Sequence, residues 1–190
     1  MVLIMVTRTD FNRYMMPTYK PADFVPSKAK GSIVWDKKNK KYIDFASGIA
    51  VSSLGHCHPT LNKALTDQSK KIWHLSNLLT NEPALRLAKI FCKHTFAEKV
   101  FFANSGAEAV EGAVKTARKH AYLNISKKKN EIVSFSDAFH GRTMMAIALN
   151  GSDRFIEGFG PMPGGIKNHP FNETKNCLLY TSPSPRDWLQ

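Results

Sequence analysis

Across residues 100–118, a short apolar segment passes directly into a helical pattern. Residues 100–103 are typical of a buried strand, and residues 107–122 carry apolar side chains at helical spacing. The joint between them is Asn104-Ser105-Gly106-Ala107. A strand that feeds a helix this closely leaves unpaired helix N–H groups at its carboxyl end, with the positive end of the helix dipole behind them. The joint is therefore either a well-made turn or a site for a small anion.

The other patterns along the chain alternate between helix and strand. Residues 33–35 and 42–45 are β-prone and flank a polar turn, which predicts a hairpin. Helical patterns, a second apolar strand and a further helical piece follow; they cover residues 58–75, 80–94, 131–135 and 139–149. This order predicts an α/β fold with a mainly parallel sheet and crossover connections, and the hairpin belongs to a separate smaller lobe.

Two interpretations of the joint remain open. In the first, Ser105 caps the helix, Glu108 closes a capping box and Gly106 eases the turn. In the second, Gly106 and Ala107 are small enough to let a phosphate reach the free amides, at the edge where open parallel sheets bind ligands. The chain has no G-x-x-x-x-G-K-[ST] element and no G-x-G-x-x-G after a strand, so a single phosphate monoester fits better than a nucleotide.

A second motif, "DAFHGRT" at residues 137–143, follows the next predicted strand and is expected at the same edge of the sheet. Phe139 can stack on a flat ring, and the forked guanidinium of Arg142 suits a carboxylate. The alternatives are that Phe139 belongs to the core and Arg142 is a surface charge. Together with the joint, the motif favours a phosphorylated aromatic cofactor and a carboxylate substrate.

The formal net charge of +12 raises a different function, a basic non-catalytic module that binds nucleic acid or an anionic surface. The lysines gather in two turn-like runs, residues 36–41 and 126–130, without interleaved aromatic residues that stack on bases. We interpret both runs as solvated loops, and we expect neither nucleic acid nor membrane as a partner.

Three scattered cysteines, Cys57, Cys92 and Cys177, are too few for a disulfide framework and predict a cytoplasmic protein. The apolar opening "MVLIMV" is too short for a signal peptide or a membrane span, and Met5 is an alternative start. The neighbours His56, Cys57 and His58 raise the possibility of a metal site. Without a second ligand cluster, they predict a tight loop and no metal.

The segments "YIDFASGIAVSSLGHCHP", "VFFANSGAEAVEGAVKTAR" and "FHGRT" resemble the class III aminotransferases, which bind pyridoxal phosphate (PLP) on a fold-type-I scaffold. More narrowly, "HLSNLLTNEPALRLAK" and "EGFGPMPGGI" are similar to the bacterial acetylornithine and succinylornithine aminotransferases. The resemblance runs from residue 7 to residue 172. It implies that residues 1–55 begin the small domain, and that residues 56–176 form the first part of the PLP-binding large domain.

The resemblance also implies roles for particular residues. Ser105, Gly106 and Ala107 would bind the PLP phosphate, Phe139 would pack against the pyridine ring, and Arg142 would hold the α-carboxylate of the substrate. Members of this family are cytoplasmic homodimers that move an amino group from an amino acid, here acetylornithine, to the 2-oxo acid 2-oxoglutarate.

The resemblance also bears on four other parts of the sequence. The resemblance places residues 47–50 near the substrate pocket, and His140 is interpreted as a wall of that pocket. Leu79 departs from an aromatic common in relatives, which leaves the acylated ornithine undecided. Val110 replaces a common asparagine on a helix face where an apolar residue packs well.

The chemistry of this family also needs a Schiff-base lysine and a carboxylate beside the pyridine nitrogen. No catalytic residue of this kind is expected in the chain, because Lys167 and Lys175 lie in polar sequence that predicts loops. Residues 177–187, "CLLYTSPSPRD", read as a translated transposase-type sequencing adapter, so residues 177–190 are expected to be a non-native tail. We therefore expect an inactive fragment whose sheet edge and apolar face are uncovered, which favours aggregation.

Overall fold

The computed structural model describes residues 5–173, and the chain divides into two compact units, Met1–Thr80 and Asn81–Gln190. Each unit is described separately below. The division falls after Thr80, whereas the sequence places a domain boundary after residue 55. The predicted domains refer to the longer proteins of the family, so that assignment stays a prediction. Lys175 and the proposed non-native tail lie outside the described residues.

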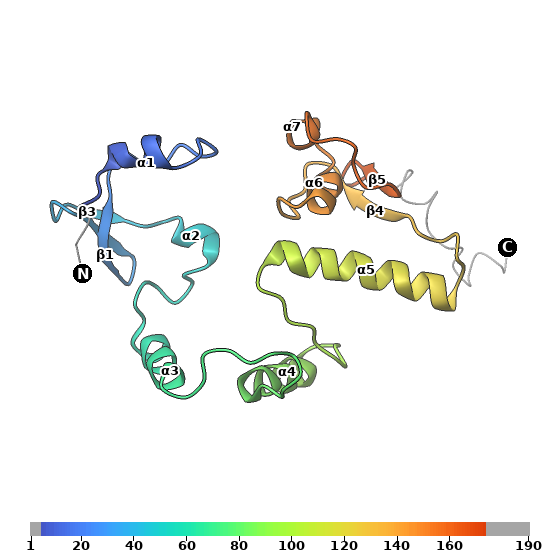
Figure 1. The fold of residues 1–190 in the computed structure, drawn as a ribbon, viewed down its shortest axis with the longest axis horizontal. Helices are drawn as coiled ribbons and strands as arrows, with labels where there is room; N and C mark the ends of the chain where they lie inside the picture. Colours follow the sequence, from blue (N-terminus) through green and yellow to red (C-terminus); the bar gives the residue numbers. More distant parts are fainter. Residues whose placement is uncertain (1–4, 174–190) are drawn as a thin grey trace. The chain divides into compact units, whose positions relative to one another are not determined.

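The first unit contains a three-stranded antiparallel sheet in the order β1-β2-β3 (Figure 1). The strands are β1 (Pro26–Lys30), β2 (Ile33–Asp36) and β3 (Lys41–Ile43), and they follow the short helix α1 (Arg8–Tyr14). The pairing of β2 with β3 confirms the predicted hairpin. Strand β1 was not predicted, because its sequence, PSKAK, is polar and almost entirely exposed.

The first lysine run forms the turn of this hairpin. The Asp36 carboxylate accepts hydrogen bonds from the N–H groups of Lys38 and Lys40, at 2.8 and 2.9 Å, and from the Tyr42 hydroxyl at 3.1 Å. Burial raises the pKa of Asp36, but these donors outweigh it and the net pKa is lowered. The run is therefore a structured turn that is built around one carboxylate.

Two helices complete the first unit: α2 (Ser47–Ala50) and α3 (Pro59–Ser69). Pro59 is the first residue of α3, as predicted, because a proline at this position loses no intrahelical hydrogen bond. Leu61 and Leu65, which fall on one face of the helix by their spacing, are 52% and 73% exposed. Helical spacing predicts which side chains share a face, but it does not show whether another element covers that face.

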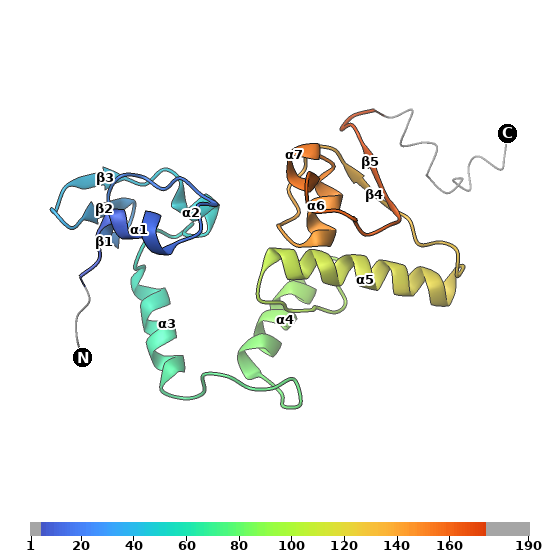
Figure 2. The ribbon, with the colours of Figure 1, turned by 45° about the horizontal axis from the view of Figure 1, so that its top comes forward.

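The second unit is built from helices and a parallel pair of strands (Figure 2). Strand β4 (Ile132–Phe135) pairs with β5 (Ile166–His169) in parallel register, from Ile132 opposite Ile166 to Phe135 opposite His169. The helices are α4 (Glu82–His94), α5 (Gly106–Asn124), α6 (Met144–Asn150) and α7 (Asp153–Ile156). The last two lie in the connection between the strands, which confirms the predicted α/β class with a parallel crossover.

Two predictions about strands were wrong. Residues 100–103 form no strand, and Phe101 and Phe102 are 77% and 43% exposed. A strand exists only through hydrogen bonds to a neighbour, and no segment within residues 5–173 forms a ladder with this one. Conversely, Lys167 lies in β5 rather than in a loop, because this polar segment pairs with the apolar strand β4.

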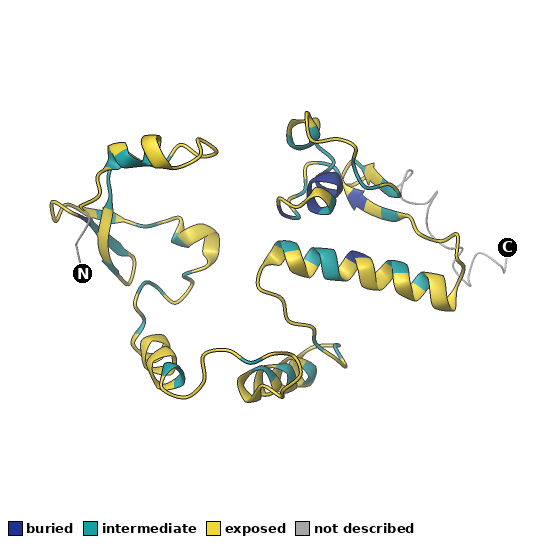
Figure 3. Ribbon diagram, in the orientation of Figure 1, coloured by how far each residue is buried: buried dark blue, intermediate teal, exposed yellow. Residues whose placement is uncertain are grey.

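The core of the second unit is centred on α6, which contacts α5, α7, β4 and β5. Of its five buried apolar residues in the described part of the chain, four come from little more than one turn of α6: Ala146, Ile147, Ala148 and Leu149, with Val114 from α5 (Figure 3). Because α6 directly follows the "FHGRT" motif, this core fixes the position of that motif. None of the helices within residues 5–173 is long and apolar enough to cross a membrane.

Candidate functional site

Ser105 is the N-cap of helix α5. Its Oγ accepts a hydrogen bond from the N–H of Glu108 at 3.2 Å, and its hydroxyl faces the Glu108 carboxylate at 3.4 Å. This confirms that Ser105 caps the helix. The Glu108 side chain also lies 3.4 Å from the amide nitrogen of the Asn104 side chain, so the carboxylate is held beside the cap by two polar neighbours.

The two residues that follow the cap leave a space for a ligand. The side-chain position of Gly106 is open, since a Cβ placed there meets no heavy atom of the described residues within 4 Å. The N–H groups of Gly106 and Ala107 have no acceptor within the described part of the chain, as expected for the first turn of a helix. Helix α5 is 19 residues long, and its dipole adds a favourable field for an anion at this end.

Gly141 brings the second motif against this helix start. It has a φ of +123°, and a Cβ at this position would lie only 2.8 Å from the Cβ of Ala107. A side chain is therefore excluded both by the backbone conformation and by the neighbouring helix. The structure places the "FHGRT" motif beside the Ser105 joint. The predicted shared sheet edge is not formed in the described residues, because residues 100–103 form no strand.

Asn150 at the end of α6 holds this motif, and the sequence analysis missed it. Its side chain is completely buried; Oδ1 accepts a hydrogen bond from the N–H of His140 at 2.6 Å, and Nδ2 donates to the carbonyl of Gly141 at 3.3 Å. The available signal was a single polar residue at the end of the apolar run "MMAIALN". The proposed role of His140 as a wall of the pocket stays a prediction.

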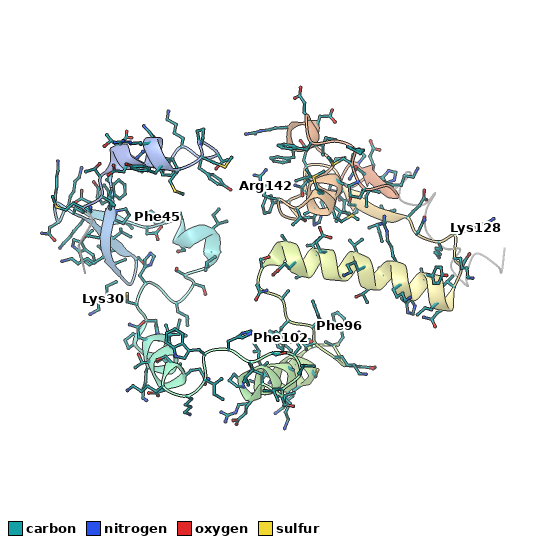
Figure 4. The ribbon with its side chains drawn as sticks, viewed as in Figure 1. Lys30, Phe45, Phe96, Phe102, Lys128 and Arg142 are labelled. Atoms are coloured by element: carbon teal, nitrogen blue, oxygen red, sulfur yellow. The ribbon has the colours of Figure 1, made fainter. Side chains whose placement is uncertain are left out.

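Phe139 and Arg142 both lie at the surface of the second unit. Phe139 is 68% exposed, so within the described residues it is not part of the core of the second unit. The Cζ atom of Arg142 lies over the Phe139 ring, 5.3 Å from its centroid, and 4.4 Å from the centroid of Phe155 on α7. Arg142 itself is labelled in Figure 4. No carboxylate of the described residues forms an ion pair with Arg142, so its N–H groups can bind an incoming carboxylate.

In the first unit, the His56 side chain contacts the Asp44 carboxylate. Its Nε2 lies 2.7 Å from Oδ2 of Asp44, and Oδ1 of Asp44 accepts the N–H groups of Ala46 and Ser47. The hydrogen bond with His56, followed by that from the Ser47 N–H, lowers the pKa of Asp44. Residues 5–173 contain no cluster of three or more potential metal ligands.

The segment expected near the substrate pocket has an unusual backbone. Four consecutive residues, 47–50, have positive φ angles, and three of them are not glycine. Asp44 fixes the start of this segment through the two N–H groups named above. Strained backbone of this kind often accompanies functional sites. The position of the segment near a substrate stays a prediction.

Most of the chain matches a known protein family. Residues 14–182 match the family described as aminotransferase class-III. The acetylornithine/succinyldiaminopimelate aminotransferase of Buchnera aphidicola subsp. Acyrthosiphon pisum is 53% identical over 169 residues, which are 89% of this chain and 41% of that protein. The acetylornithine aminotransferase of Vibrio cholerae is 53% identical over 168 residues, 88% of this chain and 42% of that protein. The chain thus spans about two fifths of the length of these relatives.

Solved structures give the same result for the fold. The ornithine aminotransferase from Toxoplasma gondii ME49 superposes with a TM-score of 0.82 at 28% identity, covering 88% of this chain and 40% of that one. The N-acetylornithine aminotransferase from Stenotrophomonas maltophilia superposes with a TM-score of 0.69 at 32% identity, covering 90% and 40%. The chain therefore belongs to the class-III aminotransferases, which share the fold-type-I scaffold and depend on pyridoxal phosphate.

Proposed function

We propose that this chain supplies the phosphate-binding and carboxylate-binding parts of an aminotransferase. The enzyme would move the amino group of N-acetylornithine, or of a related N-acylated diamino acid, to 2-oxoglutarate. The observation that carries the proposal is the contact of Gly141 with Ala107, because it brings the residue next to Arg142 against the start of α5, where the amides are free. The choice of an acylated ornithine is supported by the names of the relatives that are 53% identical.

The residues at the start of α5 fit the phosphate of PLP. The free N–H groups of Gly106 and Ala107 supply donors, Ser105 adds a hydroxyl, and the open side-chain position of Gly106 leaves room for phosphate oxygens. The exposed ring of Phe139 has an accessible face for the pyridine ring. When bound, PLP supplies an electron sink for the carbon from which the proton is removed.

Arg142 would hold the α-carboxylate of the amino-acid substrate. A guanidinium binds a carboxylate through two parallel N–H···O hydrogen bonds, which fix its orientation as well as its position. Orientation matters because the bond to be broken must be aligned with the cofactor. Arg142 would therefore select for amino acids and also align them.

The proposal assigns no proton-transferring lysine to this chain. Lys167 on β5 is paired instead with Glu131, the residue before β4, with Nζ 3.6 Å from Oε1. We propose that the Schiff-base lysine and the carboxylate beside the pyridine nitrogen lie in the part of the relatives' sequence that this chain does not cover. From the similarity to the acetylornithine aminotransferases, we also propose that the full-length enzyme is a homodimer and acts in arginine biosynthesis in the cytoplasm.

The test is an amino-transfer assay. The reading frame is extended to the length of the relatives, and the PLP-loaded protein is incubated with 2-oxoglutarate and one donor at a time. The donors are N-acetylornithine, N-succinylornithine, N-succinyl-diaminopimelate, ornithine and 4-aminobutyrate, and glutamate is the measured product. We expect the highest kcat/KM with an N-acylated donor. An absence of PLP-dependent glutamate with every donor would contradict the proposal.

A further inference from the structure

We propose that Phe155 of α7 positions the Arg142 guanidinium so that its N–H groups face the substrate carboxylate. The inference rests on the proposed function, because it adds a positioning residue to the proposed carboxylate site. Its basis is the arrangement in which Arg142 lies over two aromatic rings and forms no ion pair with a described carboxylate.

The two rings differ in how firmly they are held. Phe155 is half-buried, its N–H donates to the carbonyl of Ser152 at 3.0 Å, and its helix contacts the core helix α6. Phe139 is largely exposed and is proposed to face the cofactor. The Arg142 Cζ atom is also nearer to the Phe155 centroid, at 4.4 Å, than to that of Phe139, at 5.3 Å. Phe155 is therefore the fixed surface against which Arg142 rests.

An aromatic ring suits this task better than a carboxylate would. A ring attracts a cation through its face and leaves the N–H donors of the guanidinium unpaired. A carboxylate from the protein would occupy those donors and cancel the charge that the substrate needs. Without any partner, the long Arg142 side chain would lose more conformational freedom when the substrate binds. The ring thus orders the arginine while leaving it available to bind the substrate.

A second arginine offers a matched control. Arg154 also stands over the Phe155 ring, but its Cζ atom lies 5.8 Å from the centroid. Arg154 carries the same charge as Arg142, contacts the same ring and lies on the same helix as Phe155. Unlike Arg142, it is not adjacent to Gly141. Removal of Arg154 is therefore expected to leave substrate binding unchanged, whereas removal of the Phe155 ring is not.

The experiment uses the PLP-loaded protein extended to the length of its relatives, with the variants Phe155→Leu, Phe155→Tyr, Arg142→Ala and Arg154→Ala. For each, the KM values for N-acetylornithine and 2-oxoglutarate and the dissociation constant of PLP are measured. We expect Phe155→Leu to raise both KM values about three- to tenfold, as for loss of a cation–π contact. The dissociation constant of PLP should stay within about twofold, and Phe155→Tyr, which keeps a ring, should resemble the wild type.

The interaction between the two residues is measured by adding Phe155→Leu to Arg142→Ala. If the ring acts through Arg142, the second change raises KM no further. The inference is overturned if Phe155→Leu raises KM by the same factor in the Arg142→Ala protein as in the wild type. It is also overturned if Arg142→Ala raises KM and Phe155→Leu alone leaves KM unchanged. If Arg142→Ala itself leaves KM unchanged, the proposed carboxylate site fails instead.

A spectroscopic measurement keeps the inference testable without enzyme activity and without a change to Phe155. In the PLP-free wild-type protein, the Nε–H proton of Arg142 is assigned by its loss in Arg142→Lys. A guanidinium that rests on the ring face gives an upfield-shifted Nε–H signal. A signal at the position of a free arginine overturns the inference.

Discussion

At the scale of single residues, Asn150 connects the core to the motif that carries the proposed ligand contacts. Its side chain satisfies the N–H of His140 and the carbonyl of Gly141. We expect Asn150→Ala to lower the free energy of unfolding by about 1–3 kcal/mol for each buried backbone group that it leaves unpaired. Urea unfolding of the extended protein measures this change.

Asn124 provides the control for this prediction. It is exposed at the end of α5, and its side-chain nitrogen contacts His120 of its own helix, the carbonyl oxygen at 3.1 Å and the ring Nδ1 at 3.2 Å. Asn124→Ala should therefore change the free energy of unfolding by less than about 0.5 kcal/mol. Equal losses in the two variants would show that Asn150 does not hold the motif.

The pH dependence of the first unit is expected to involve Asp44. Its pKa is lowered, from an ordinary value of 3.8, chiefly by the hydrogen bond with His56. A carboxyl whose pKa is lower in the folded state stabilises that state above pH 3.8, and the contribution is lost as the pH falls through the folded value. The carboxyl carbon of Asp44, followed by NMR, should titrate below 3.8, and His56→Ala should move the midpoint upward. A midpoint that does not respond to His56→Ala would contradict this assignment.

The residues of the candidate site were predictable from the sequence only in part. Ser105 was recognisable as a cap, and Gly106, Phe139 and Arg142 stood in motifs whose chemistry suggested a ligand. Asn150 was not recognisable, because the partners of a buried amide are known only after the chain has folded. The same holds for Phe155, whose place beside Arg142 depends on the turn between α6 and α7.

At the scale of elements, the start of α5 makes a prediction about cofactor binding. Gly106→Ala places a methyl group in open space, so the unfolding free energy of the PLP-free protein should fall by less than about 0.5 kcal/mol. The same methyl group occupies the proposed phosphate position. We expect the dissociation constant of PLP to rise about fivefold or more, which corresponds to about 1 kcal/mol.

The matched control is Gly164→Ala. Gly164 also has no heavy atom within 4 Å of its side-chain position, but it lies in the loop before β5. This variant should bind PLP as the wild type does. If Gly106→Ala also binds PLP normally, the phosphate does not lie at the start of α5.

The elements themselves were predicted unequally. Helices α4 and α5 follow from local signals, namely apolar spacing within each segment and, for α5, a cap at Ser105. Strands depend on partners that are distant in sequence. Residues 100–103 are as apolar as β4 yet form no strand within the described part of the chain, whereas the polar segment of β5 does, because β4 lies beside it.

At the scale of the whole molecule, the large apolar side chains are mostly uncovered. Phe45, Leu78 and Phe96 are each more than nine-tenths exposed, at 92%, 92% and 101%. Exposed apolar side chains in this number favour association. We expect the 190-residue chain to elute from size-exclusion chromatography as oligomers or aggregates and to bind a hydrophobic dye. A monomer with a cooperative thermal transition would contradict this expectation.

The central claim is that Arg142 binds the substrate carboxylate beside a separate phosphate site for PLP. It is tested most directly by the KM values of Arg142→Ala in the extended, PLP-loaded protein. Loss of a charge-assisted hydrogen-bonded pair should raise the KM for N-acetylornithine about tenfold or more, with the dissociation constant of PLP within about twofold. An unchanged KM for both N-acetylornithine and 2-oxoglutarate would contradict the account.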